Sequence, residues 1–132
     1  MNIGLIGIGT VGGGTYRVLK ENAAEISNKS GIEIKITHVA DKNLKLAKET
    51  VDKETIIEED AFSLIENSSI DTIIELIGGT GIALDIVRKA LENGKHVVTA
   101  NKALIAMHGE ELFKIANKKN VLLAYEAAVA GG

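Results

Sequence analysis

The stretch that decides the fold is Asn2-Ile3-Gly4-Leu5-Ile6-Gly7-Ile8-Gly9-Thr10-Val11-Gly12, at the start of a chain of 132 residues. Its first part is almost entirely apolar, which is typical of a parallel strand covered on both faces and predicts a strand over residues 2–8. A helical pattern follows over residues 11–27, with an expected buried stripe of Val11, Val18, Leu19 and Ile26.

Between the strand and the helix, residues 7–12 have the pattern G-x-G-x-x-G. In a dinucleotide-binding turn the first glycine permits the tight turn, the second lets the backbone approach a pyrophosphate, and the third lets the helix pack closely on the strand. The helix N-terminus then offers unpaired N–H donors to the phosphates. We therefore expect Gly7, Gly9 and Gly12 to form a dinucleotide site rather than a purely structural turn. A P-loop is disfavoured because no G-K-[ST] follows these glycines.

Beyond this turn, short apolar runs alternate with helical patterns. We expect further strands at residues 32–40, 71–77, 96–100 and 121–125, and helices at 61–67, 82–92 and 102–118, the last interrupted near His108 and Gly109. Residues 42–60 are polar and only weakly helical. The order predicts one α/β domain over residues 1–132, a Rossmann-type doubly wound, mostly parallel sheet in a three-layer αβα arrangement.

Composition narrows the classes of function. The formal net charge is −3 and there is no cysteine, so we expect neither a nucleic-acid partner nor a disulfide framework. No apolar run is long enough to cross a bilayer, and the N-terminus lacks the features of a signal peptide, so we expect no membrane partner and a cytoplasmic location. The three histidines show no metal-binding spacing.

The end of the second expected strand bears on which dinucleotide binds. Asp41 would bind the ribose 2′-hydroxyl of NAD, whereas Lys42, with Lys45 and Lys48 close behind, would accept the 2′-phosphate of NADP. Asp41 lies further from the glycines than usual, which an extended first helix would explain. NAD, NADP and a merely solvated charged turn all remain open at this point.

Three later segments carry a resemblance to a known family. They are residues 75–80 (Glu-Leu-Ile-Gly-Gly-Thr), 94–104 (Gly-Lys-His-Val-Val-Thr-Ala-Asn-Lys-Ala-Leu) and 125–132 (Tyr-Glu-Ala-Ala-Val-Ala-Gly-Gly). With residues 7–12 they resemble homoserine dehydrogenase over essentially the whole chain, in the right order. Sugar-type oxidoreductases and dihydrodipicolinate reductase share the glycines and the layout, but do not usually share both later motifs.

The resemblance implies an activity and a set of roles. The family interconverts L-homoserine and L-aspartate 4-semialdehyde by hydride transfer with NAD or NADP, in the threonine and methionine branch of aspartate metabolism. By resemblance the phosphates lie on Ile8, Gly9, Thr10 and Val11, the nicotinamide ribose on Gly78, Gly79 and Thr80, and the reacting centre near Lys102. Glu126, Val129 and Gly131 match positions that hold a monovalent cation such as Na⁺, although the family often has glycine where this chain has Ala130.

Physical reasoning supports part of this assignment independently. Thr80 and Asn101 each follow an expected strand and precede an expected helix, and ligands of open α/β sheets bind at such strand ends. We therefore expect both residues, and Lys102, at the cofactor. As a catalytic residue Lys102 would stabilise an alkoxide or donate a proton, provided that burial lowers its pKa; otherwise it is an ordinary surface lysine.

The chain stops at Gly131-Gly132 directly after an apolar run, which suggests a fragment of a longer protein. The resemblance implies a C-terminal part that binds substrate and makes the full-length protein a homo-oligomer, so we expect the fragment alone to be inactive. Two other functions stay open: another amino-acid dehydrogenase or reductase of the same architecture, and a non-catalytic dinucleotide sensor that has no use for Lys102.

Overall fold

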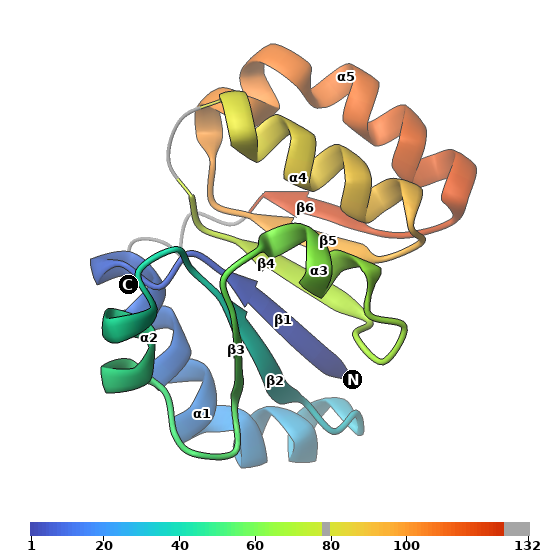
Figure 1. The fold of residues 1–132 in the computed structure, drawn as a ribbon. Helices are drawn as coiled ribbons and strands as arrows, with labels where there is room; N and C mark the ends of the chain where they lie inside the picture. The colour runs from blue at the N-terminus through green and yellow to red at the C-terminus, as the bar shows by residue number, and fades with distance from the viewer. Residues whose placement is uncertain (78–79, 126–132) are drawn as a thin grey trace.

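The computed structural model describes residues 1–77 and 80–125, and in them five helices cover the two faces of one six-stranded sheet (Figure 1). In chain order the elements are β1 (Asn2–Ile6), α1 (Thr10–Ser30), β2 (Lys35–Ala40), α2 (Leu44–Thr50), β3 (Ile56–Glu58), α3 (Ala61–Glu66), β4 (Thr72–Glu75), α4 (Gly81–Glu92), β5 (His96–Thr99), α5 (Lys102–Lys119) and β6 (Leu123–Tyr125).

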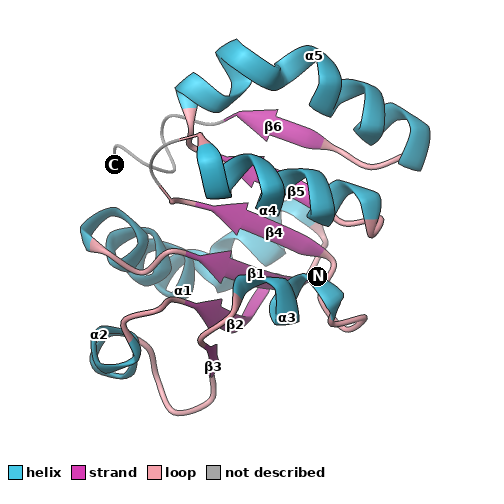
Figure 2. Ribbon diagram, turned by 45° about the horizontal axis from the view of Figure 1, so that its top comes forward, coloured by secondary structure: helices cyan, strands magenta, loops and turns pink. Residues whose placement is uncertain are grey.

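The strand order is β3-β2-β1-β4-β5-β6, and every neighbouring pair is parallel. The chain builds outward from β1 through β2 to β3, then crosses back to β4 and builds outward in the other direction. The order therefore reverses between β1 and β4, and ligands bind outside the carboxyl ends of the strands at such a point. Figure 2 shows all the strand arrows running toward the same edge. The doubly wound fold predicted from the sequence is confirmed.

Two apolar cores hold the three layers together. One lies between the sheet and helices α1 and α2, and includes Leu5, Ile8, Tyr16 and Ala47. The other lies beneath α3, α4 and α5; its members include Leu64, Ile73, Ile86, Val97 and Leu112. Because both faces of the sheet are covered, the middle residues of β1 and β4 are apolar on both faces rather than alternating, as the sequence of β1 indicated.

The predicted buried stripe of α1 is wrong in one respect. Val18 is 55% exposed, whereas Gly12, Gly13 and Tyr16 are buried. A β-carbon at Gly12 would lie 1.8 Å from the carbonyl oxygen of Gly7. The helix therefore contacts the sheet through glycine backbone at its start, and its branched side chains are not needed there.

Two further predictions need correction. The polar stretch 42–60 contains the helix α2, which agrees with its weak helical pattern, but also the strand β3, which was not predicted because it is only three residues long and pairs with β2 at the edge of the sheet. Helix α5 is not interrupted at His108 and Gly109. Gly109 is buried inside it, with the Ile105 side chain 3.5 Å from its ideal β-carbon, so packing outweighs the low helix propensity of glycine.

Candidate functional site

The turn after β1 has the geometry that its glycines predict. Gly7 has a φ of +97°, a conformation that L-residues rarely adopt, and its N–H donates to the carbonyl of Ala40 at 2.9 Å. Gly12 touches the backbone of Gly7, as the previous section describes, so any side chain at Gly12 would push α1 away from β1. The first and third glycines thus bring the N-terminus of α1 to the carboxyl end of β1.

The middle glycine leaves that N-terminus open. Gly9 is the N-cap residue of α1, and among the described residues no side chain caps the helix there. No acidic residue occupies the first turn, and within residues 1–77 and 80–125 no heavy atom lies within 4 Å of an ideal β-carbon on Gly9. A helix N-terminus carries partial positive charge and unpaired N–H groups, so this space suits an anionic group such as a phosphate.

Asp41 is fixed beside this turn by two backbone N–H groups. Its Oδ2 accepts from the Ile8 N–H at 2.7 Å, and its Oδ1 accepts from the Asn43 N–H at 2.8 Å. The carboxylate therefore connects the end of β2 to the glycine turn rather than lying free in solvent. Because each carboxylate oxygen has two acceptor sites, both oxygens can still accept from a ribose hydroxyl. Lys42 next to it is exposed.

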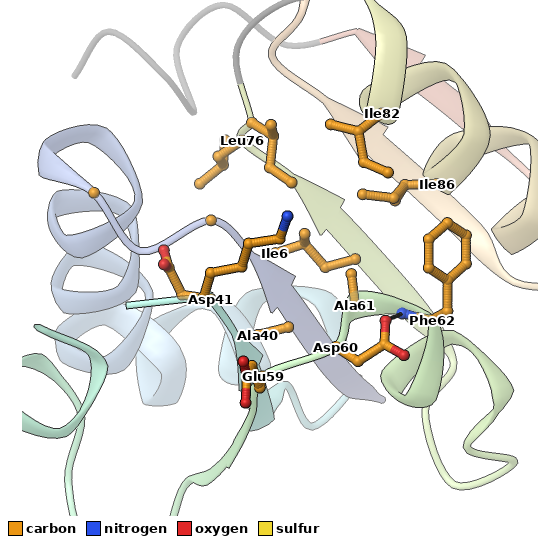
Figure 3. A pocket seen from close by; sticks show the side chains of 14 residues that line it. Ile6, Ala40, Asp41, Glu59, Asp60, Ala61, Phe62, Leu76, Ile82 and Ile86 are labelled. Atoms are coloured by element: carbon orange, nitrogen blue, oxygen red, sulfur yellow. Dashed lines mark hydrogen bonds between the residues drawn. The ribbon is translucent and has the colours of Figure 1, made fainter. Parts of the chain in front are cut away.

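A pocket of about 730 Å³ opens beside Asp41 at the switch point of the sheet, within the size range of small-molecule sites. Gly7, Gly9, Asp41 and Lys42 line one side of it. Figure 3 shows Phe62 of α3 and Ile82 and Ile86 of α4 on the opposite side. The pocket combines an apolar wall for a flat ring with polar groups for a sugar and phosphates. Its apolar wall was not predicted, because it comes from helices distant in the sequence.

The carboxyl ends of β4 and β5 lead directly into two helices. Thr80 is the N-cap residue of α4, and Asn101 is the N-cap residue of α5, where its Oδ1 accepts from the Leu104 N–H at 3.0 Å. Lys102 is the first residue of α5 and is exposed in this chain. The burial that the sequence argument required for Lys102 is therefore not found within these residues.

Glu75, the last residue of β4, is the functional candidate that the sequence argument missed. Its side chain is fully buried, and its Oε2 accepts from the Thr99 hydroxyl at 2.7 Å. Burial raises the pKa of this carboxyl, while the Thr99 hydrogen bond and the Ile77 backbone oppose the rise. A glutamate inside the apolar run Ile73-Ile74-Glu75-Leu76-Ile77 was the signal that could have identified it.

Some predicted site residues lie outside the described part of the chain: Gly78, Gly79, Glu126, Val129 and Gly131. Thr10 and Val11 begin α1. Within residues 1–77 and 80–125, no group of three or more histidine, aspartate or glutamate side chains is arranged to hold a metal ion. No helix in this part is both long and apolar enough to cross a membrane.

Comparison with known proteins gives one consistent family. Residues 7–126 match the family described as "Homoserine dehydrogenase, NAD binding domain". Homoserine dehydrogenases of Neisseria gonorrhoeae and Pseudomonas aeruginosa are each 49% identical to the chain over 132 residues. The crystal structure of a homoserine dehydrogenase from Thiobacillus denitrificans superposes with a TM-score of 0.90 at 43% identity and covers 97% of the chain. The chain spans only 30% of the length of each of these three relatives.

Proposed function

The chain belongs to the family of homoserine dehydrogenase NAD-binding domains, and from that premise we propose that it is the NAD(P)-binding part of an oxidoreductase that interconverts L-homoserine and L-aspartate 4-semialdehyde. The observation that carries the proposal is the uncapped N-terminus of α1 over Gly9, which lies beside a fixed carboxylate at the switch point of the sheet. Each of these features suits one part of a dinucleotide.

Different residues of the site suit the pyrophosphate, the adenosine and the nicotinamide of the dinucleotide. The pyrophosphate would lie over Gly9, where the helix N-terminus supplies N–H donors and no described residue fills the space of a β-carbon. The adenosine would occupy the pocket, with its base against Phe62 and Ile86 and its ribose at Asp41. The nicotinamide end would then extend toward Thr80 and the start of α5. The bound nicotinamide ring supplies the acceptor or donor of the hydride.

Lys102 would act on the substrate oxygen that gains or loses a proton. A cation at the first residue of a helix faces the positive end of the helix dipole, so its place there does not stabilise α5. That position does present the amine at the carboxyl edge of the sheet, where ligands bind. Because Lys102 is exposed in this chain, we propose that the remainder of the protein covers it and supplies the groups that bind homoserine.

The same geometry leaves roles for both charged residues at the end of β2. Asp41, held by two N–H groups, favours the ribose hydroxyls of NAD, while Lys42 offers a cation to the 2′-phosphate of NADP. We further propose that Glu126, Val129 and Gly131 contribute to a monovalent cation site, and that the full-length protein is a homo-oligomer. The isolated residues 1–132 are expected to bind dinucleotide without turning over homoserine.

The test is an assay of the full-length protein with L-homoserine and NAD⁺ or NADP⁺, which follows the absorbance of the reduced cofactor. The proposal predicts turnover with at least one cofactor and none with a sugar substrate. Turnover of a different amino acid with no activity on homoserine would favour a related dehydrogenase. Dinucleotide binding with no turnover of any substrate would favour a non-catalytic dinucleotide sensor.

A further inference from the structure

The buried carboxyl of Glu75 lies between two parts of the proposed site. It ends β4, three residues after the strand begins and five before Thr80, and it is paired with Thr99 in the sheet register. Its side chain shares a strand face with Ile73, and Thr99 shares a strand face with Val97; both of these neighbours belong to the core under α4 and α5. Glu75 and Thr99 therefore lie on the sheet face that α4 and α5 cover.

A chain of hydrogen bonds runs from Glu75 to the start of α5. The Thr99 hydroxyl donates to Glu75 Oε2 at 2.7 Å and accepts from the Asn101 N–H at 3.0 Å. The Asn101 side chain in turn caps the helix through Leu104 and reaches back to the Ile77 carbonyl at 3.5 Å. We call Glu75, Thr99 and Asn101 the β4–β5 latch, because they join the end of β4 to the turn that carries Lys102.

A glutamate at this position is costly to bury. Its second oxygen, Oε1, is buried and has no hydrogen-bond partner among the described residues. Burying a carboxyl with an unsatisfied oxygen is unfavourable compared with an apolar side chain of similar volume. An acceptor for Thr99 is what the carboxyl provides and what a leucine would not.

We propose that Glu75 is a positioning residue that, through Thr99 and Asn101, fixes the first turn of α5 and thereby the place of Lys102 in the reaction. The proposal rests on the proposed function, since Lys102 matters only if the protein transfers hydride. Glu75 touches neither cofactor nor substrate in this account. It acts on the geometry of the turn at residues 99–102.

The test uses the full-length protein with three substitutions at the latch and one matched control. Glu75→Leu removes the acceptor, Thr99→Val removes the bridging hydroxyl at constant volume, and Thr99→Ser restores that hydroxyl. Thr72→Val is the control, because Thr72 is a buried threonine at the opposite end of the same strand. Each variant is measured for kcat, for KM and Kd of the dinucleotide, for Tm, and for amide hydrogen exchange in residues 102–106.

A displacement of about 1 Å at a reacting group costs up to about 10²-fold in rate. We therefore expect E75L and T99V to lower kcat by about 10- to 100-fold, with Kd of the dinucleotide within about threefold of wild type. Exchange of the Leu104 and Ile105 amides, which bond to Asn101, should quicken in both variants without a fall in Tm of E75L. T99S should recover most of the loss, and T72V should match wild type.

Two results would overturn the proposal. The first is a kcat of E75L and T99V within about threefold of T72V, since a latch that positions Lys102 must affect the rate. The second is exchange that quickens evenly along α5 together with a lower Tm in both variants, which would show a structural role only. If the wild-type protein does not oxidise homoserine, the proposed function fails, but the exchange measurement still decides whether the latch orders α5.

Discussion

Replacing Gly9 with alanine should separate the binding role of the glycine turn from its structural role. An alanine β-carbon at Gly9 meets no heavy atom of the described residues within 4 Å, and the φ of −55° is one that any residue adopts. The cost of losing glycine at an N-cap is about 0.5–1 kcal/mol, and the smaller entropy of the unfolded chain offsets about 0.4–1 kcal/mol. The free energy of unfolding should therefore change by less than about 1 kcal/mol.

Binding of the dinucleotide should change far more. The added methyl group projects into the space where the pyrophosphate approaches the N-terminus of α1, so at least one N–H bond to a charged oxygen is lost or lengthened. Hydrogen bonds to charged groups contribute about 1.5–3 kcal/mol, which corresponds to a rise in Kd of about 10- to 100-fold.

Gly12→Ala is the matched comparison, because it places the same methyl group where there is no room. Its β-carbon would lie 1.8 Å from the Gly7 oxygen and 2.7 Å from the Gly7 carbonyl carbon. Overpacking of this kind costs about 1–3 kcal/mol, or a fall in Tm of about 4–12 °C. Thermal unfolding and cofactor-fluorescence titration of both variants give the assay. An unchanged Kd in G9A would refute the assignment of the pyrophosphate to this turn.

Three other substitutions test separate parts of the account. Asp41→Asn removes a charged acceptor for the ribose hydroxyls of NADH and also the repulsion that the carboxylate exerts on the 2′-phosphate of NADPH. The ratio of Kd for NADPH to Kd for NADH should therefore fall by about tenfold or more. An unchanged ratio in paired titrations would show that Asp41 does not select between the two dinucleotides. Lys102→Ala in the full-length protein should lower kcat by about 10²-fold or more, while Kd of the dinucleotide stays within about threefold of wild type. The control is Lys114→Ala, because Lys114 is an exposed lysine of the same helix. An equal fall in kcat in both variants would mean that Lys102 has no special role. Glu75 should make the free energy of unfolding depend on pH. Because its pKa is raised by burial, the folded state keeps the proton at pH values where the unfolded state has lost it. The contribution of Glu75 to stability is therefore fully present below its ordinary pKa of 4.5 and declines as pH rises through the pKa in the folded state. The difference in unfolding free energy between E75L and wild type, measured by urea titration from pH 4 to 7, should therefore shift in favour of E75L as pH rises, and a flat difference would contradict the burial effect.

The parts of the fold that follow from local pattern were predictable. The apolar β1, the glycine turn and the stripe on α4 each depend on neighbouring residues, and from them the doubly wound sheet followed. The buried face at the start of α1 was not predictable from hydrophobic periodicity. Gly12 and Gly13 bury backbone there, whereas the periodicity placed Val18 on the buried face. The edge strand β3 is only three residues long, so its Ile56-Ile57 pair is too short an apolar run to predict a strand.

The candidate site also has features that follow from local sequence and features that depend on tertiary packing. Gly9 and Asp41 could be placed at the carboxyl ends of β1 and β2 from the sequence, because each directly follows an apolar strand pattern. The hydrogen bonds of Asp41 to Ile8 and Asn43 could not be foreseen, since they depend on how far the end of β2 lies from the turn. The wall formed by Phe62 and Ile86 joins two helices that only the packing of α3 against α4 brings together.

The two lysines of residues 94–104 lie in different environments. Lys95 and Lys102 belong to the same motif in the sequence, but Lys95 is buried and its Nζ donates to the carbonyls of Asn67 and Ile70 at 2.8 and 2.7 Å. Burial lowers the pKa of Lys95, with Asp71 opposing the shift. Its bonds lie at the amino-terminal edge of β4, away from the pocket, so this lysine holds the loop before the strand in place.

The most direct test of the central claim is a calorimetric titration of the protein with NADH and NADPH, each at two salt concentrations. We expect one dinucleotide per chain with a Kd below about 1 mM for at least one of the two, since the helix N-terminus at Gly9, the fixed carboxylate of Asp41 and the apolar wall of the pocket each contribute to binding. NADPH affinity that weakens with salt would assign the 2′-phosphate to Lys42. If neither dinucleotide bound more tightly than millimolar, the assignment of this site to NAD(P) would be contradicted.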